Sequence, residues 1–251
     1  MATYRLSASL ISRSRGRSAT AAAAYRAAER IPDARTGMVH DYTRRGGVLH
    51  TEIMTPADTP AWMQDRAQLW NGVEAAEKRR DAQLAREVQL SLPHELSDAQ
   101  RLDLLRGFVG EQFVAKGMIA DVALHAPDPR GDNRNHHAHV MLTTRTLTGE
   151  GFGKKDRSWN DTALLENWRS AWERHANRAL DAAGREERID HRSLEAQGLD
   201  REPEPKQGPI ATEMEKQGRR SNAGDDRRAV QARNAERAAR EDERKVISLE
   251  I

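Results

Sequence analysis

Short stretches of apolar residues, most of them alternating with polar ones, predict where the strands of this chain lie. Alternation with a period of two is typical of a strand with one buried face. In the first stretch, Leu6, Ala8 and Leu10 share one side. The other side, made of Arg5, Ser7, Ser9 and Ile11, is expected to face water. The predicted strands span residues 4–11, 38–42, 48–54, 85–92, 118–125 and 137–145.

Helical periodicity and capping residues fill the intervals between these strands. An alanine-rich segment begins at Ser18 or Thr20, either of which can cap a helix, and Pro32 is expected to end it. Strands 38–42 and 48–54 are expected to pair with each other across a turn at residues 44–47. Further helices are predicted at about residues 60–82, 98–113 and 160–182, the second of these behind a capping box at Ser97.

The stretch from His125 to Arg145, which contains the last predicted strand and the end of the one before it, holds four of the nine histidines. His137 and His139 are two positions apart, so both point to one face of their strand, opposite an apolar face. His125 falls on the polar face of the preceding strand, and turn-forming residues at 127–133 favour an antiparallel hairpin. That hairpin would bring three imidazoles together as a metal site with open coordination positions. Surface histidines without a metal are the alternative, and His136 is expected to point to the other face.

Composition limits the kinds of site that the chain can form. The 251 residues include no cysteine, which excludes disulfides, thiolate metal ligands and a cysteine nucleophile. Charged residues make up 32% and apolar residues only 37%, so part of the chain is expected to be solvated or extended helix. The start is too short and polar for a signal peptide, and no run of about 18 apolar residues suggests a membrane span. We therefore expect a soluble cytoplasmic protein without membrane insertion.

Positive charge is concentrated near the N-terminus, although the formal net charge of the chain is only +2. Residues 1–45 hold nine Arg and three acidic residues. Arg13, Arg15 and Arg17 form a basic loop of small residues that suits contact with a phosphate backbone. Arg26 in the following helix is grouped with them, and Trp159, in a loop after the histidine hairpin, is a candidate for stacking on a nucleic-acid base.

Tyr25 is the candidate nucleophile, with a merely packed aromatic as the alternative. It follows the basic loop and is surrounded by alanines, which leaves its hydroxyl accessible. A phenol is protonated at neutral pH, so it needs a nearby cation or base to react. Glu87, on the polar face of its predicted strand, is a general base for Tyr25, a partner that orients an imidazole, or a solvated carboxylate.

Together these residues resemble the MobA/MobL family of conjugative relaxases, including TraA-like N-terminal relaxase domains, within the wider group of HUH endonucleases. The histidines lie in N-H-H-A-H-V-M-L-T-T-R from Asn135, and L-W-N-G-V-E-A-A-E-K-R-R-D-A-Q-L-A-R-E runs up to Glu87. W-R-S-A-W-E-R-H-A-N from Trp168 and I-D-H-R-S-L-E-A-Q-G-L from Ile189 extend the resemblance over about residues 3–220. P-E-P-K-Q-G at 203–208 departs from it, because many relatives have a histidine before the glycine.

The resemblance implies an α+β fold, with a five-stranded antiparallel sheet flanked by helices, over residues 1–200. Residues 201–251 would be a charged helical or disordered extension, either a compact ending or a linker to a further domain. The implied chemistry is nicking and religation of plasmid DNA at an origin of transfer. Tyr25 would attack the scissile phosphate and leave a 5′-phosphotyrosyl link and a free 3′-OH. His125, His137 and His139 would hold a divalent cation, Mg or Mn in function, with Zn, Ni or Co as alternatives.

The resemblance also implies partners in a bacterial cytoplasm. They are single-stranded DNA at the origin of transfer, relaxosome accessory proteins and the coupling protein of a type IV secretion system. Two other functions stay open on the sequence. One is a rolling-circle replication initiator or transposase of the same superfamily, and the other is a non-catalytic DNA-binding autoregulator in which the basic N-terminus only grips the backbone.

Overall fold

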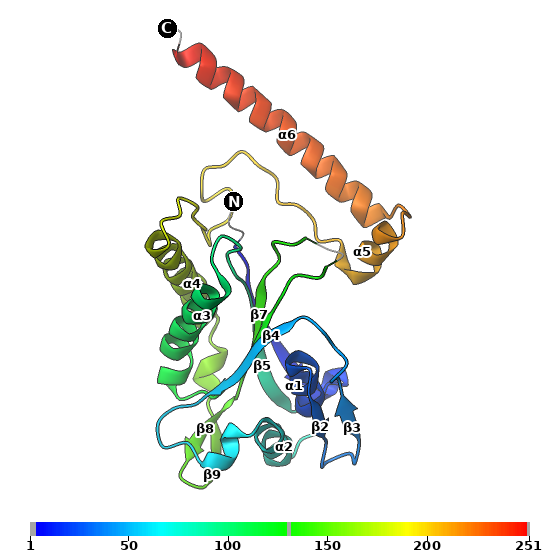
Figure 1. Ribbon diagram of the computed structural model, residues 1–251, viewed down its shortest axis with the longest axis vertical. Helices are drawn as coiled ribbons and strands as arrows, with labels where there is room; N and C mark the ends of the chain where they lie inside the picture. The colour runs from blue at the N-terminus through cyan, green and yellow to red at the C-terminus, as the bar shows by residue number, and fades with distance from the viewer. Residues whose placement is uncertain (1–3, 130–131, 250–251) are drawn as a thin grey trace. The chain divides into compact units, whose positions relative to one another are not determined.

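A five-stranded antiparallel sheet forms the centre of the larger of two compact units (Figure 1). The computed structural model describes residues 4–129 and 132–249, so two positions of the loop predicted at 127–133 lie outside the described residues. The strand order is β1-β5-β7-β6-β4, and the predicted α+β fold with this sheet is confirmed. The strands are β1 (Leu6–Ser12), β4 (Val48–Met54), β5 (Gln83–Ser91), β6 (Ala120–His125) and β7 (His137–Leu142).

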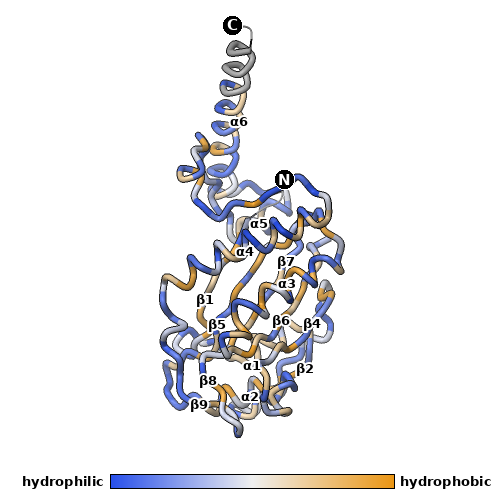
Figure 2. Tube along the Cα trace, turned by 90° about the vertical axis from the view of Figure 1, so that its left-hand side faces the viewer, coloured by the Kyte–Doolittle hydropathy of each residue, from blue (hydrophilic) through white to orange (hydrophobic). Residues whose placement is uncertain are grey.

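Helices cover both faces of this sheet, α3 and α4 on one and α1 and α2 on the other (Figure 1). Their bounds are α1 (Ala19–Ala27), α2 (Arg66–Ala76), α3 (Asp98–Gln112) and α4 (Thr162–Ala182). Two small hairpins lie outside the main sheet, β2 (Arg30–Pro32) with β3 (Val39–Asp41) and β8 (Arg145–Thr148) with β9 (Gly151–Lys155). Figure 2 shows the hydrophobic positions concentrated along the strands and the helix sides that face them.

The core between the sheet and α3 and α4 is built from aromatic rings. Phe108 lies edge-on to both Phe113 and Trp172, with ring centroids 5.5 Å and 5.0 Å away. Apolar side chains from β5, β6 and β7 close this cluster from the sheet side. The predicted capping box is confirmed, because Ser97 and Gln100 hydrogen-bond each other's backbone at the start of α3.

The opposite face is covered by smaller side chains. Ala19, Ala23 and Ala24 of α1 are buried against Ile11 of β1 and Met141 of β7. Ile11 is therefore fully buried, and the expectation that its face of β1 is exposed to water is wrong at this position. The alanines let the backbone of α1 approach the sheet closely, which places the last turn of the helix next to β6.

The ends of α1 are set by its first and last turns. Ser18 accepts a hydrogen bond from the backbone N–H of Ala21, which satisfies one of the free donors of the first turn. The helix ends at Ala27, and Ala28 adopts a left-handed conformation with φ of 55°. The prediction that Pro32 ends the helix is wrong, because the chain has already entered β2 at Arg30.

The pairing predicted for residues 38–42 and 48–54 is wrong, although both segments contain strands. β3 pairs with β2, and β4 pairs with β6 at the edge of the main sheet. Strands adjacent in sequence often pair, but here the pairing partners are decided by tertiary contacts. Ile31 of β2 is fully buried beside α1, and this holds the small hairpin against that helix instead of β4.

The smaller unit comprises Arg192–Ile251, so the chain divides nine residues before the boundary expected at residue 200. It contains an extended segment, then α5 (Gly208–Lys216) and α6 (Asn222–Leu249). Its described contacts are mainly ion pairs, such as Arg233 with Glu202 at 2.7 Å and Arg228 with Glu215 at 2.8 Å. In residues 4–129 and 132–249, no helix has the length and apolar character needed to cross a membrane.

Candidate functional site

Three histidines of the central hairpin lie side by side on the face of the sheet that α1 covers. His125 of β6 is directly opposite His137 of β7, and His139 is opposite Ala123, the next residue of β6 on that face. The three ring centroids are 5.0–5.4 Å apart. One nitrogen of each imidazole lies within 4.8 Å of the other two, a separation that a single cation can bridge.

Each imidazole is held by an oxygen atom that can only accept a hydrogen bond. The pairs are His125 Nε2 with the carbonyl of Arg26 at 2.7 Å, His137 Nδ1 with the carbonyl of Asn135 at 2.9 Å, and His139 Nδ1 with Glu87 Oε1 at 2.7 Å. The bonded ring nitrogen must therefore carry a proton, and whenever a ring is neutral its other nitrogen keeps a lone pair. Imidazoles that ligate metals are oriented in this way, so the donor set fits a cation.

Burial keeps two imidazoles of the cluster in the form that binds a cation. It lowers the pKa of His125 to about 4, against an opposing hydrogen bond to the Arg26 carbonyl, and the neighbouring His139 lowers it further. Burial also lowers the pKa of His137. Both rings are consequently neutral at pH 7 and present lone pairs without first losing a proton.

Glu87 lies beneath the cluster and contacts it directly. Burial alone would raise the pKa of Glu87, but hydrogen bonds from His139 and Arg26 hold it at about 2. Arg26 pairs with both carboxylate oxygens, at 2.6 Å each. A carboxylate with so low a pKa is a weak base, so these contacts match the expected partner that orients an imidazole better than a general base for Tyr25.

Tyr25 projects from the last turn of α1, and its side chain is 45% exposed. The guanidinium of Arg45 lies 3.8 Å from the centre of the Tyr25 ring, and Tyr42 packs edge-on at 5.2 Å. Arg45 also donates a hydrogen bond to the Tyr25 carbonyl. The sequence missed Arg45 and Tyr42, because Arg45 was interpreted as part of a hairpin turn; the doubled arginine at 44–45 was the available signal.

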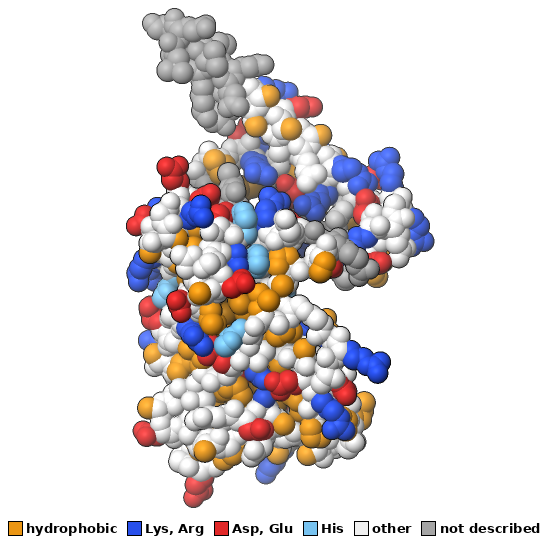
Figure 3. Space-filling view, in the orientation of Figure 1, with side chains coloured by type: hydrophobic (Ala, Val, Ile, Leu, Met, Phe, Trp, Pro, Cys, Tyr) orange, Lys and Arg blue, Asp and Glu red, His pale blue; other side chains and the backbone are white. Residues whose placement is uncertain are grey.

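Tyr25 and one member of the histidine cluster, His139, line the same hollow. This cavity of about 490 Å³ is lined by Tyr25, His139, Glu87, Arg17 and Arg26. Several histidines reach the surface on the face of the molecule drawn in Figure 3. A tyrosine, one histidine of the potential cation site and arginine side chains thus line one space.

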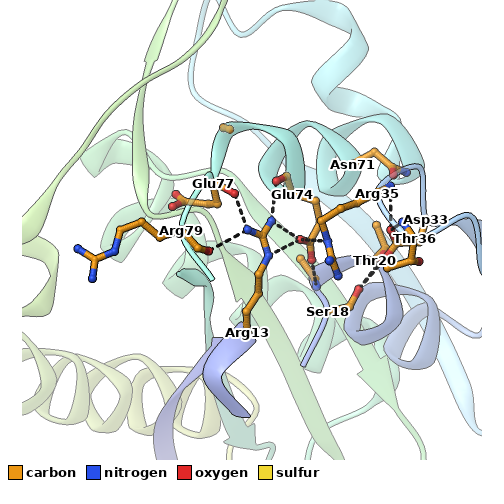
Figure 4. A network of polar contacts seen from close by, with 12 residues as sticks. Arg13, Ser18, Thr20, Asp33, Arg35, Thr36, Asn71, Glu74, Glu77 and Arg79 are labelled. Carbon is orange, nitrogen blue, oxygen red and sulfur yellow. Dashed lines mark hydrogen bonds and ion pairs between the residues drawn. The ribbon is translucent and has the colours of Figure 1, made fainter. Parts of the chain in front are cut away.

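The structure corrects the role expected of Arg13. All of its guanidinium donors point inward, to the Glu74 carboxylate and to the carbonyls of Glu74, Glu77 and Arg79 (Figure 4). No donor remains for a phosphate. Arg15 and Arg17 of the same loop are exposed, as a phosphate contact requires, whereas Arg26 is occupied by Glu87.

The stacking role expected of Trp159 is also contradicted. Its side chain is only 8% exposed and belongs to the aromatic core with Trp168 and Trp172. The sequence around Trp159 is typical of a loop, but residues 157–160 form a short 3₁₀ helix in which the indole is buried. Trp168 and Trp172 are likewise buried in the core.

Comparison with known proteins gives consistent results over most of the chain. The sequence model of the MobA/MobL family matches residues 17–217. The mobilization protein MobL of Acidithiobacillus ferridurans is 45% identical over 246 residues, which cover 86% of this chain and 64% of the relative. The conjugal transfer protein TraA of Rhizobium radiobacter is 38% identical, over 81% of this chain and 21% of TraA. The chain therefore spans less than two thirds of the length of these relatives.

Two solved structures share the fold. One, described under the molecular basis of vancomycin resistance transfer in Staphylococcus aureus, is 30% identical with a TM-score of 0.71, over 76% of this chain and all of that chain. The other, of the conjugative relaxase TrwC in complex with oriT DNA, has a TM-score of 0.52 over 93% of this chain and 99% of the chain in that structure. At 12% identity, the second likeness shows the fold alone.

Proposed function

The chain belongs to the MobA/MobL family, and from that premise we propose that it is a plasmid relaxase that nicks and rejoins one DNA strand at an origin of transfer. The observation that carries the proposal is the hollow that Tyr25 shares with His139, one of the three clustered histidines. An oxygen nucleophile beside imidazoles that can hold a cation is the arrangement that phosphoryl transfer to a tyrosine requires.

His125, His137 and His139 would hold a divalent cation through the ring nitrogens that keep their lone pairs. Such a cation supplies positive charge that polarises the scissile phosphate and stabilises the charge that develops on it. Mg or Mn is the proposed functional ion, with Zn, Ni or Co as alternatives. TrwC, whose fold this chain shares, is described both with oriT DNA and in a metal-bound form, which supports the proposal.

The proposed reaction exchanges one phosphoester bond for another. The Tyr25 oxygen bonds to the scissile phosphorus, the bond from phosphorus to the 3′ oxygen breaks, and the phenolic proton is lost while the 3′ oxygen gains one. The products are a 5′-phosphotyrosyl link and a free 3′-OH, and attack by a 3′-OH reverses the step. Arg45, over the Tyr25 ring, and exposed Arg17 add positive charge where the phosphate would enter.

The proposal includes the partners and the setting that family membership implies. Single-stranded DNA at the origin of transfer is the substrate. Accessory proteins of the relaxosome and the coupling protein of a type IV secretion system are the proposed protein partners, in a bacterial cytoplasm. Residues 201–251 are proposed to act as a charged extension of the catalytic part of the chain.

Covalent adduct formation tests this proposal. Labelled single-stranded oligonucleotides that tile the plasmid region around the gene are incubated with protein and Mn²⁺, and adducts are resolved on a denaturing gel. We expect one oligonucleotide to form an adduct, Tyr25→Phe to abolish it, and Tyr42→Phe, the matched control on the neighbouring ring, to retain it. EDTA should prevent cleavage. An adduct that persists in Tyr25→Phe would contradict the assignment of Tyr25 as the nucleophile. DNA binding by the unsubstituted protein without any adduct would favour the non-catalytic autoregulator.

A further inference from the structure

Two further hollows continue from the one that holds Tyr25. The second, of about 670 Å³, shares Arg17 and Ser18 with it. The third, of about 680 Å³, shares Lys78 and Arg79 with the second. The three adjoin in series along the surface around the loop that follows α2, and end near Arg157. We call this series the basic groove.

The carboxylates that line the basic groove are all paired, whereas several of its cations have no described ion-pair partner. Each of the four carboxylates has a described partner: Glu77 with Lys155 at 3.0 Å, Asp81 with Arg79 at 2.9 Å, Asp33 with the Thr20 hydroxyl at 2.7 Å, and Glu87 with Arg26 at 2.6 Å.

In contrast, four exposed cations of the groove have no ion-pair partner in the part of the chain that the structure describes: Arg17, Lys78, Arg80 and Arg157. On the face drawn in Figure 3, Lys and Arg side chains are instead interspersed with Asp and Glu. Unpaired cations along a hollow favour an extended anion.

The loop that carries Lys78 and Arg80 is held from inside. The buried guanidinium of Arg13 donates to the carbonyls of Glu77 and Arg79, on either side of Lys78 (Figure 4). Because main-chain carbonyls are the acceptors, the contact sets the path of the backbone whatever side chains the loop presents. The cations at 78 and 80 therefore project from a fixed support.

We propose that the basic groove binds one flank of the single strand whose scissile phosphate lies at Tyr25. The inference rests on the proposed function for the position of that phosphate. Successive phosphates of the flank pass Arg17, then Lys78 and Arg80, and then Arg157. The contacts are to the backbone, so they add affinity without reading sequence.

Binding of oligothymidylates tests the groove separately from catalysis. Fluorescein-labelled strands of about 4 and about 16 nucleotides span the usual site sizes of single-strand grooves. The groove variant is Lys78→Gln with Arg80→Gln. The control is Arg174→Gln with Arg178→Gln, which removes two exposed cations from α4 on the other face of the sheet. Affinity is followed by fluorescence anisotropy at several salt concentrations.

We expect the groove variant to bind the longer strand about tenfold more weakly at low salt, and its salt slope to fall by about 1.4, since each lost phosphate contact removes about 0.7. The control variant should match the unsubstituted protein, and the shorter strand should show a smaller loss. Equal affinities of the two variants for the longer strand, or a loss of affinity that does not depend on strand length, would contradict the proposed DNA-binding groove.

A crosslink determines whether one flank follows this path. Because the chain has no cysteine, Arg157→Cys can be labelled at that position alone with a photoreactive maleimide. We expect crosslinks to nucleotides on only one side of the nick in the oligonucleotide that forms the adduct. Crosslinks to both sides would contradict the groove. Absence of any adduct with the unsubstituted protein, together with intact groove-dependent binding, would instead count against the proposed function.

Discussion

The two faces of the central sheet are covered in opposite ways. Between the sheet and α3 and α4, aromatic rings such as Phe108 and Trp172 pack edge-on in an apolar core. Between the sheet and α1 and α2, alanines bring the helix backbone close, and buried carboxylates such as Glu74 and Glu87 are paired with arginines. The first face supplies most of the hydrophobic stabilisation, and the second holds polar groups in fixed positions.

One strand contributes to both faces through its alternation. Ala138 and Val140 of β7 enter the aromatic core, whereas His137 and His139 face α1. The same backbone thus carries stabilising residues and the candidate site, so substitutions on the two faces should separate stability from chemistry.

The largest expected effect is a loss of stability from the aromatic face. Trp172→Ala should lower the free energy of unfolding by about 3–5 kcal/mol, because the fully buried indole leaves a cavity beside Phe108. Urea unfolding measures this. Metal affinity of the folded variant should stay unchanged; a variant that keeps its stability but loses metal binding would contradict the division between the faces.

On the face of the sheet that α1 covers, His137→Ala should lower metal affinity and leave stability nearly unchanged. We expect its affinity for Mn²⁺ to fall by more than the roughly 100-fold that loss of an outer partner costs. Its unfolding free energy should change by less than about 1 kcal/mol, since the ring is only partly buried. Calorimetry gives the affinity, and His136→Ala, one residue away and outside the cluster, is the control. Full-affinity uptake by His137→Ala would refute the placement of the ion.

Glu87→Gln sharpens the comparison within the site. The amide oxygen can still accept from His139, but the charge that holds Arg26 and polarises the imidazole is lost. We expect a loss of about tenfold in metal affinity with adduct formation reduced but present. Complete loss of adduct at saturating Mn²⁺ would point instead to Glu87 as the general base.

The smallest effect concerns acid stability at the start of α1. Burial would raise the pKa of Asp33, but the Thr20 and Ser18 hydroxyls and neighbouring backbone N–H groups hold it at about 2, below the ordinary 3.8. The stabilisation is therefore present above about pH 4 and lost as pH falls towards 2. Thr20→Val should remove about 1 kcal/mol of it. Urea unfolding at pH 5 and pH 3 should show a smaller pH dependence for Thr20→Val than for the unsubstituted protein; an identical dependence would exclude this contact as the cause.

Alternation predicted the histidine hairpin because the face to which a strand residue points depends only on local geometry. Two residues that are two positions apart on a strand share one face, whatever surrounds the strand. Local capping signals likewise identified Ser18 and Ser97. What failed depended on distant partners. Arg13 looked like a phosphate contact until Glu74, 61 residues away, accounted for its guanidinium.

Burial of Trp159 and the pairing of β4 with β6 were equally hidden, since neither leaves a periodic signal nearby. The fold class and the face of the site were therefore predictable from the sequence. The identity of the groups around Tyr25 was not.

The hydrogen bond from His125 to the Arg26 carbonyl has a consequence for engineering. Its acceptor is the main-chain carbonyl of the residue after Tyr25, so no substitution of the Arg26 side chain removes that acceptor. A chimaera that receives α1 from a relative would take over both the proposed nucleophile and the carbonyl that orients the His125 imidazole in one segment. Grafts should begin before Ser18 and end after Ala28, where the helix is already delimited by its own cap and its left-handed residue.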